Sequence, residues 1–365
     1  MRSLPQFGIE GVAETVAQQV ERQNDQADAY RREYHLVGIG LQRLAGGVGQ
    51  GSQGGHRRLD AGKVLGIVGK SGSGKSVSAY SILRILTDTG RVTEGEVLFR
   101  GENILNYSEQ QMQKFRGSRI SIIFQDPMTC LNPTFSIGSQ LREAIRIHTD
   151  RSKEQVQARA LEMLQLVGVN EPEKRLKQYP HELSGGMRQC VMIAMALACE
   201  PDILIADEPT TALDVTIQAQ ILELMKELQE KLGMAIIMVT HDLGVIADMC
   251  DEIIVMYGGK VCERGTADEI FYNPRHEYTK GLIRSIPRIS KTHEKLIPIA
   301  GTPVDLLNLP AGCAFASRCD RAMKICLTEH PEEIRINENH IVACWNNVKQ
   351  MMEEAENSGE EGGKQ

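Results

Sequence analysis

The sequence predicts an α/β protein with a buried, mostly parallel sheet. Three apolar runs have the length of buried strands: "KVLGIVG" at residues 63–69, "DILIADE" at 202–208 and "AIIMVTH" at 235–241. Residues 217–232, between the last two runs, place Ile, Leu and Met on one stripe at helical spacing. Strands that alternate with an amphipathic helix are typical of a parallel sheet covered by helices.

Local patterns predict the remaining elements. Ser108 and Gln111 form a capping-box pattern at the start of a helix. Gly258 and Gly259 separate two apolar runs, which predicts a β-hairpin. A strand pair or strand–turn is expected at residues 94–104 and a strand at 119–125. Helices are expected at residues 75–86 and over about 140–198, the latter broken at 168–180.

Composition excludes several classes of protein. The 365 residues are 41% hydrophobic and 24% charged, as in ordinary globular proteins. The net charge is −7, of which five glutamates and one lysine in residues 353–365 contribute −4, so the chain lacks the basic character of a nucleic-acid binder. The longest uncharged apolar run, residues 190–199, is too short to cross a bilayer. Nine scattered cysteines and a start without signal-peptide features lead us to expect a reducing, cytoplasmic compartment.

Residues 69–76, "GKSGSGKS", fit the phosphate-loop pattern between a predicted strand and a predicted helix. Glycines let the backbone curl so that its N–H groups face phosphate oxygens, while Lys75 supplies positive charge and the Ser76 hydroxyl binds Mg²⁺. The alternative is a merely flexible glycine loop. The predicted phosphate-binding residues are Gly69, Lys70, Ser71, Gly72, Ser73, Gly74, Lys75 and Ser76.

An acidic pair and a histidine follow two of the predicted strands. Asp207 directly ends a buried strand, where a carboxylate can hold Mg²⁺, and Glu208 can polarise a water for in-line attack on a γ-phosphate. His241, after the next strand, can contact the same phosphate. Acidic pairs and lone histidines also cap many strand ends without any catalytic role.

A second anion site is predicted at "LSGGMRQ", residues 183–189. Ser184, Gly185 and Gly186 stand at the expected start of a helix, where free N–H groups and the helix dipole favour anions. Two phosphate-binding elements far apart in one chain suggest a site that is completed across a dimer interface.

The motifs "GKSGSGKS", "FQDP", "LSGGMRQ", "ILIADEPTTALD" and "THD" resemble, in this order, those of the ATP-binding subunits of ABC transporters. The wording of "IIFQDPMTCLNP" and "HEYTKGLIRSIP" is similar to the peptide/nickel importer branch. The resemblance covers residues 59–345. It implies an ABC-type nucleotide-binding domain, with a RecA-like phosphate-loop core, a helical subdomain and a small cysteine-containing C-terminal extension.

The resemblance also implies roles for single residues. Ser76, Gln125 and Asp207 would surround Mg²⁺, and Gln125 would also sense the γ-phosphate and face the membrane subunit. Glu208 would be the general base and His241 the switch residue. The ATP held by a partner subunit would be contacted by Ser184, Gly185, Gly186, Gln189 and Asp214.

By this resemblance the chain hydrolyses ATP to power import of peptides or nickel. Its expected partners are membrane-spanning permease subunits, a homologous sister ATPase or a second copy, and, indirectly, an extracellular substrate-binding protein. The expected location is the cytoplasmic face of the membrane. The alternatives are an ABC ATPase that is not coupled to transport and the non-catalytic product of a disrupted gene. Cys130 and Cys190 replace the serine and arginine that are usual in the family, and neither replacement removes a catalytic group.

Four cysteines near the C-terminus form a separate candidate site. Cys313, Cys319, Cys326 and Cys344 are separated by five, six and seventeen residues, wider than most structural zinc hooks. Four thiolates are the usual ligands of an iron–sulfur cube, and similar cysteines hold a [4Fe–4S] cluster in the extension of peptide-importer ATPases. Zinc and simple packing of the thiols remain alternatives.

These features divide the chain into four expected parts. Residues 59–265 form the ATPase domain, with the helical subdomain at about 140–198, and residues 266–348 form the C-terminal extension. Residues 349–365 form an acidic tail that we expect to be disordered. Residues 1–58 are atypical: seven glycines fall between Gly40 and Gly55, and the aromatic residue and strand that precede the phosphate loop in the family are missing.

Our hypothesis is that residues 1 to about 58 come from a shifted reading frame. The codons for "GSQGGHRRL", residues 51–59, permit "AVKAVTVDL" when they are read one nucleotide later, and that string is the missing strand. The alternative is a genuine N-terminal extension.

We predict that the +1 frame of the encoding DNA upstream of Leu59 contains this strand and, further upstream, an aromatic residue suited to stacking on adenine. Sequencing of the genomic DNA tests the hypothesis. Stop codons in that frame, or the absence of both features, would eliminate it.

Overall fold

The computed structural model describes residues 34–35, 39–41, 59–86, 90, 92–211, 213–286, 298–306 and 308–351. Apart from the short strands β1 (Tyr34–His35) and β2 (Ile39–Leu41), the segment with the proposed frame shift lies outside the described residues, as does most of the acidic tail.

The central sheet of the described chain is mixed, in the order β12-β13-β11-β10-β3-β9-β8-β7. Its parallel part consists of β10 (Glu252–Tyr257), β3 (Val64–Val68), β9 (Ala235–Thr240), β8 (Ile203–Asp207) and β7 (Ile120–Ile123). The predicted hairpin is confirmed: β11 (Lys260–Thr266) returns antiparallel to β10. The strands β13 (His340–Val342) and β12 (Ile334–Asn337) continue the antiparallel edge, so the sheet is less uniformly parallel than its apolar runs suggest.

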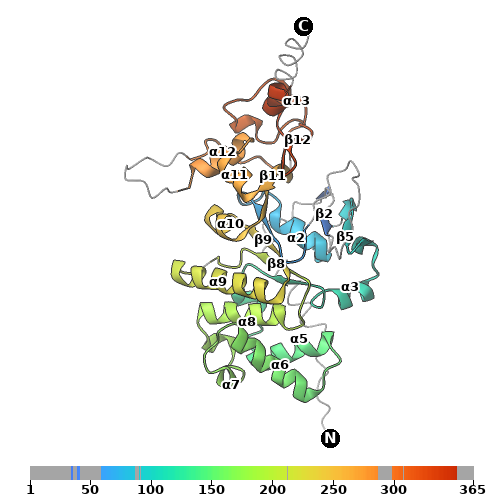
Figure 1. The fold of residues 1–365 in the computed structure, drawn as a ribbon, viewed down its shortest axis with the longest axis vertical. Coiled ribbons are helices and arrows are strands. Elements are labelled where there is room, and N and C mark those ends of the chain that lie inside the picture. Colours follow the sequence, from blue (N-terminus) through green and yellow to red (C-terminus); the bar gives the residue numbers. More distant parts are fainter. Residues whose placement is uncertain are drawn as a thin grey trace, which may run out of the picture.

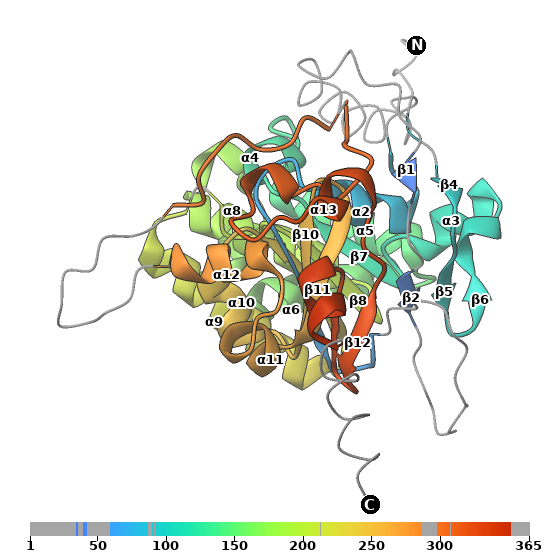
Figure 2. The same ribbon diagram turned by 90° about the horizontal axis from the view of Figure 1, so that it is seen from above.

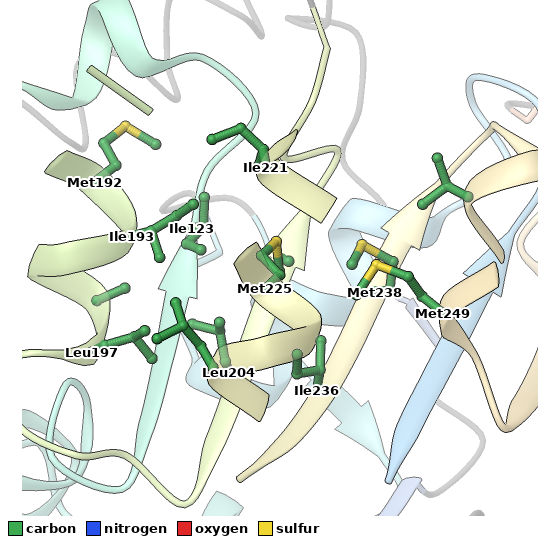
Figure 3. Close-up of a cluster of buried hydrophobic side chains, with 14 of the residues drawn as sticks. Ile123, Met192, Ile193, Leu197, Leu204, Ile221, Met225, Ile236, Met238 and Met249 are labelled. Carbon is green, nitrogen blue, oxygen red and sulfur yellow. The ribbon is translucent and has the colours of Figure 1, made fainter. Parts of the chain in front are cut away.

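Helices cover both faces of the parallel strands. Alternate residues of β8 and β9 point to opposite faces: Leu204 and Ile236 join one buried cluster, whereas Ile205 and Ile237 join the other. The first face carries α8 (Gly185–Leu197), α9 (Val215–Leu232) and α10 (Leu243–Met249), and the second carries α2 (Lys75–Leu83) and α3 (Glu109–Phe115). Figure 3 shows the first face, where Met225 of α9 lies between Ile193 of α8 and Met238 of β9.

A helical region extends from one end of the sheet (Figure 1). Its longer helices are α5 (Ile137–His148), α6 (Lys153–Leu166) and α8, and it also contains the short helices α4 (Pro127–Cys130), α7 (Pro172–Arg175) and η2 (Pro180–Glu182). The predicted capping box of Ser108 is present at α3. A small sheet of β2, β5 (Val97–Phe99) and β6 (Glu102–Asn103) lies beside α3, on the side of the central strands away from α9 (Figure 2). The strand β4 (Val92–Glu94) pairs with β1, and η1 (Ile104–Asn106) follows β6.

The C-terminal region packs at the opposite end, on the β10–β11 hairpin (Figure 1). It contains α11 (Ala267–Tyr272), α12 (Glu277–Arg284), η3 (Ala316–Arg318), α13 (Ile325–Thr328) and the strands β12 and β13.

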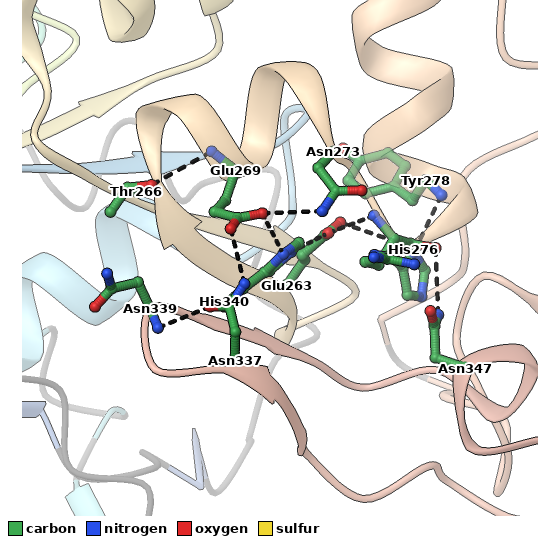
Figure 4. Close-up of polar contacts among 11 residues, drawn as sticks. Glu263, Thr266, Glu269, Asn273, His276, Tyr278, Asn337, Asn339, His340 and Asn347 are labelled. Atoms are coloured by element: carbon green, nitrogen blue, oxygen red, sulfur yellow. Dashed lines mark hydrogen bonds and ion pairs between the residues drawn. The ribbon is translucent and has the colours of Figure 1, made fainter. Parts of the chain in front are cut away.

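A buried polar network ties this region to the sheet (Figure 4). His340 of β13 is fully buried, and its ring lies between two carboxylates, with Nε2 2.8 Å from Glu263 of β11 and Nδ1 3.1 Å from Glu269 of α11. Glu263 also accepts hydrogen bonds from the backbone N–H groups of Arg275 and His276, so a single carboxylate joins three segments.

We predict that His340→Ala lowers the free energy of unfolding by about 3–5 kcal/mol, because it leaves the buried Glu263 carboxylate without the ring that pairs with it. Urea denaturation measures the loss. The control is His330→Ala, since the His330 ring bonds to the carbonyl of the adjacent Pro331. Equal stability of the two variants would contradict the importance of the network.

Candidate functional site

The predicted phosphate loop connects β3 to α2 at the carboxyl end of the parallel strands. Gly74, which caps α2, has a φ of 93°, a conformation that residues with a side chain rarely adopt. At Gly69 an added Cβ would lie 2.3 Å from the backbone oxygen of Met256, so only glycine lets the loop pass this close to β10. The sequence pattern therefore reflects real steric demands of the loop.

Lys75 lies inside the loop and is 5% exposed. Its Nζ donates to the backbone oxygen of Gly69 at 2.8 Å and to that of Lys70 at 3.3 Å. Burial lowers the pKa of the Lys75 ammonium group, an effect that the nearby carboxylates of Glu208 and Asp207 oppose. A desolvated ammonium group held only by neutral carbonyls is well suited to bind an anion.

Asp207 ends β8 and has no exposed surface. Its carboxylate accepts hydrogen bonds from Ser76 at 2.9 Å and from Tyr80 at 2.8 Å. Burial raises the pKa of this carboxyl group, and the two hydrogen bonds partly counter that shift. A carboxylate and a serine hydroxyl side by side are oxygen ligands of the kind that Mg²⁺ prefers.

The adjacent Glu208 has a different environment. Its φ of 46° is unusual for a residue with a side chain, and its backbone N–H donates to Val239 of β9 at 2.7 Å. The carboxylate contacts three side chains from separate segments, at distances of 2.9–3.1 Å: Gln125 Nε2, Thr211 Oγ1 and His241 Nδ1. The structure thus brings together the three residues that were predicted to be catalytic.

Two members of this site were missed from the sequence. Tyr80 lies four residues after Ser76 on α2, a spacing that places both side chains on one helical face. Thr211 lies three residues after Glu208, within a turn closed by its own N–H. The spacing was available in both cases, but many residues share it.

The second predicted anion site lies at the start of α8. Ser184 caps this helix by accepting from the N–H of Met187, and Gly185 and Gly186 form its first turn. Gln189 is 1% exposed and its Nε2 has no hydrogen-bond partner in the structure. Asp214 caps α9 in the same manner, 3.0 Å from the N–H of Ile217. No side chain among Ser184, Gln189 and Asp214 hydrogen-bonds to the phosphate loop within the described part of the chain.

The four C-terminal cysteines converge. Cys313, Cys319, Cys326 and Cys344 all line one small cavity, together with Phe315. All four are free thiols, and burial raises the pKa of Cys313 to about 11. The donor set matches an iron–sulfur cluster. The cavity that they line, at about 10 Å³, has room for roughly one water. No three His, Cys, Asp or Glu side chains among the described residues form a metal-binding group.

The fold and the phosphate loop define a nucleotide-binding domain. No helix among the described residues is long and apolar enough to span a membrane. Residues 53–211 match the model of the ABC transporter family, and residues 262–326 match the oligopeptide/dipeptide transporter C-terminal region.

Curated relatives agree. The chain is 52% identical over 301 residues to the dipeptide transport ATP-binding protein DppD of Bacillus subtilis. The aligned region covers 82% of this chain and 90% of the relative. It is 48% identical over 294 residues to the oligopeptide transport ATP-binding protein OppD of Escherichia coli, with 80% and 87% covered. The solved structure of cbiO1 from Clostridium perfringens, described as part of the ABC transporter complex cbiONQ, has 31% identity and a TM-score of 0.53, covering 60% of this chain and 83% of that one. The dimeric cassette MJ0796 bound to ADP and Pi has 31% identity and a TM-score of 0.51, covering 57% and 87%.

The chain belongs to the ABC transporter family, among the ATP-binding subunits of oligopeptide and dipeptide transporters. The predicted α/β class, the ABC-type fold and the ATPase activity are thereby confirmed.

Proposed function

We propose that this chain hydrolyses ATP to drive import of peptides through a membrane-bound ABC transporter. The observation that carries the proposal is that two neighbouring carboxylates at the end of β8 contact different sets of residues. Asp207 is buried and bonded to Ser76 of the phosphate loop, whereas Glu208 faces Gln125 and His241. One carboxylate thus belongs with the phosphates and their metal, and the other belongs with the attacking water.

In this proposal Asp207 and Ser76 hold Mg²⁺, with Gln125 nearby. A bound Mg²⁺ neutralises charge on the phosphate oxygens. Lys75 exchanges its carbonyl partners for phosphate oxygens, so the loop is preorganised for an anion before nucleotide arrives.

Glu208 acts as the general base for the attacking water. Gln125 and Thr211 donate hydrogen bonds to its carboxylate, which fixes the direction of the free lone pairs. His241 lies 3.1 Å from the other carboxylate oxygen and is more than half exposed, as expected for a residue that contacts the γ-phosphate only in a closed state.

A second ATPase subunit, either a sister chain or a second copy, completes the site. Ser184, Gly185 and Gly186 lie at the start of α8. Among the described residues, they make no hydrogen bond to the phosphate loop of the same chain. Gln189 has an unsatisfied amide, and Asp214 stands at the start of α9. The solved cassette MJ0796 is described as dimeric, which supports this arrangement.

The permease docks on the helical region beside Gln125. Phe135 and Tyr179 are large side chains that are 50% and 42% exposed there. Peptides are the proposed cargo because the matched relatives are described as dipeptide and oligopeptide transport proteins and because residues 262–326 match the C-terminal region of such transporters. The proposed location is therefore the cytoplasmic face of the membrane.

We further propose that Cys313, Cys319, Cys326 and Cys344 hold a [4Fe–4S] cluster with a structural role. The support is their convergence on one cavity in a region with few regular elements. Binding requires the thiols to lose their protons, and burial raises the pKa of Cys313, Cys319 and Cys344, so cluster binding must overcome this shift.

We predict that Lys75→Ala abolishes ATP-dependent transport and weakens nucleotide binding strongly, since the phosphates lose the only side-chain cation within the loop's interior. Glu208→Gln is the matched comparison: it retains ATP binding and accumulates a nucleotide-bound dimer, because only the water-activating group is lost. Equilibrium nucleotide binding and phosphate release measure both variants. Near-normal hydrolysis by Lys75→Ala would refute the site.

We also predict that crosslinks from the cytoplasmic loops of the permease map to residues 140–180, because this helical segment lies along the chain between Gln125, the proposed γ-phosphate sensor, and the start of α8, and because it carries the exposed Tyr179. Crosslinking of the assembled transporter followed by mass spectrometry identifies the residues. Crosslinks confined to the region after Thr266 would contradict this docking site.

Protein purified without oxygen is predicted to contain about four irons per chain, and Cys319→Ser is predicted to lose iron and stability together. Iron analysis and thermal unfolding provide the readouts, and Cys199→Ser, outside the cavity, is the control. Stoichiometric zinc without iron would overturn the cluster assignment.

A further inference from the structure

The segment "HEYTKGLIRSIP", residues 276–287, contributes no residue to the chemistry described above. We propose that Tyr278, from α12 of the C-terminal region, is a positioning residue that holds Lys75 in place through the Gly69–Lys70 peptide unit. The inference rests on the proposed ATP-binding role of the loop and adds a distant residue to that site.

The geometry consists of two hydrogen bonds on one peptide plane. The backbone N–H of Lys70 donates to the Tyr278 hydroxyl at 2.9 Å, and the carbonyl of Gly69 accepts from Lys75 Nζ at 2.8 Å. This N–H and this C=O belong to the same trans peptide unit and therefore point in opposite directions. Tyr278 therefore bonds to one side of this planar peptide unit, and Lys75 bonds to the opposite side.

Such a chain of hydrogen bonds strengthens itself, because each bond polarises the peptide for the next in a low-dielectric interior. The carbonyl of Lys70 adds to the arrangement, since it accepts from the N–H of Ser73 at 3.1 Å and from Lys75 Nζ at 3.3 Å. Fixing the Lys70 backbone therefore fixes both oxygen partners of the lysine.

Tyr278 is itself rigidly held. Its side chain has no exposed surface, and its ring lies 4.7 Å from that of Tyr257 and 5.3 Å from that of Phe315, measured between centroids. Its backbone N–H donates to His276, which caps α12 (Figure 4). Burial raises the pKa of the phenol, so the hydroxyl stays neutral and is available as an acceptor.

The C-terminal region also borders the loop elsewhere. A cavity of about 220 Å³ is lined on one side by Lys70, Ser71 and Gly72 and on the other by residues 303–306. The Tyr257 hydroxyl bonds only to the C-terminal side of this cavity, because it accepts from the N–H of Val304 and from Arg318. Among the described contacts, the hydrogen bond from Lys70 to Tyr278 is therefore the one that reaches the loop from this aromatic cluster.

The test is Tyr278→Phe in the full chain, which removes the hydroxyl and keeps the ring. We expect the Kd for MgATP and the KM of the ATPase to rise about three- to tenfold with kcat unchanged, as for loss of one hydrogen bond that supports ground state and transition state equally. Tyr257→Phe is the matched control, because it removes a hydroxyl from the same aromatic cluster. That hydroxyl bonds to Val304 and Arg318 and not to the phosphate loop. A merely structural role would lower the active fraction, and so the apparent kcat, without moving KM.

Wild-type KM in Tyr278→Phe, or an equal rise in Tyr257→Phe, would overturn the inference. In the Lys75→Ala background, Tyr278→Phe is expected to cause no further loss of binding to a fluorescent ATP analogue, and additive losses would also overturn it. Should Tyr278→Phe fail to fold, hydrogen exchange in the wild-type chain decides: a protected Lys70 amide supports the contact, and a freely exchanging one removes it. If Lys75→Ala alone binds ATP normally, the proposed function fails instead.

Discussion

The site depends on the pairing of β3 with β9 on one side and β10 on the other. These parallel strands end at the same edge of the sheet, so their carboxyl ends place Gly69, His241 and Tyr257 within one small region. β8 pairs with β9 and adds Asp207 and Glu208 to this edge. Residues separated by more than a hundred positions thereby meet, as Ser76 and Asp207 do.

Neighbouring residues on β8 acquire different chemistry because a strand alternates its faces and because the chain turns sharply after it. Asp207 still belongs to the strand, pairs opposite Val239 and points toward α2, where Ser76 and Tyr80 meet it. Glu208, with its positive φ, lies beyond the strand and faces Gln125 and His241. A backbone conformation that costs energy separates a carboxylate bonded to Ser76 and Tyr80 from one bonded to Gln125 and Thr211.

The C-terminal region is joined to the nucleotide-binding core by buried polar and aromatic contacts as well as by the chain itself. The Glu263–His340–Glu269 network ties β11 to β13 and α11, and the aromatic cluster of Tyr257 and Tyr278 ties β10 to α12. Phe315 belongs to that cluster and also lines the cysteine cavity. The aromatic cluster thus connects the cysteine cavity, through a few packed rings, to the backbone of the phosphate loop at Lys70.

The sequence by itself determined the motifs whose function depends on local backbone form. The glycines of residues 69–76 and the capping serine at α8 each encode a turn or a helix start within a few residues, and the acidic pair Asp207–Glu208 directly ends a buried strand, so their places in the fold were predictable. It also determined the class of fold, because strand-length apolar runs that alternate with an amphipathic helix are typical of α/β proteins. Only the tertiary structure decided which side chains complete the site. Tyr80, Thr211 and Tyr278 are recognisable as partners only through the atoms that they contact, and the four cysteines only through the cavity that they share. The physical reason is that such contacts depend on strand order and helix packing, which spacing along the chain does not specify.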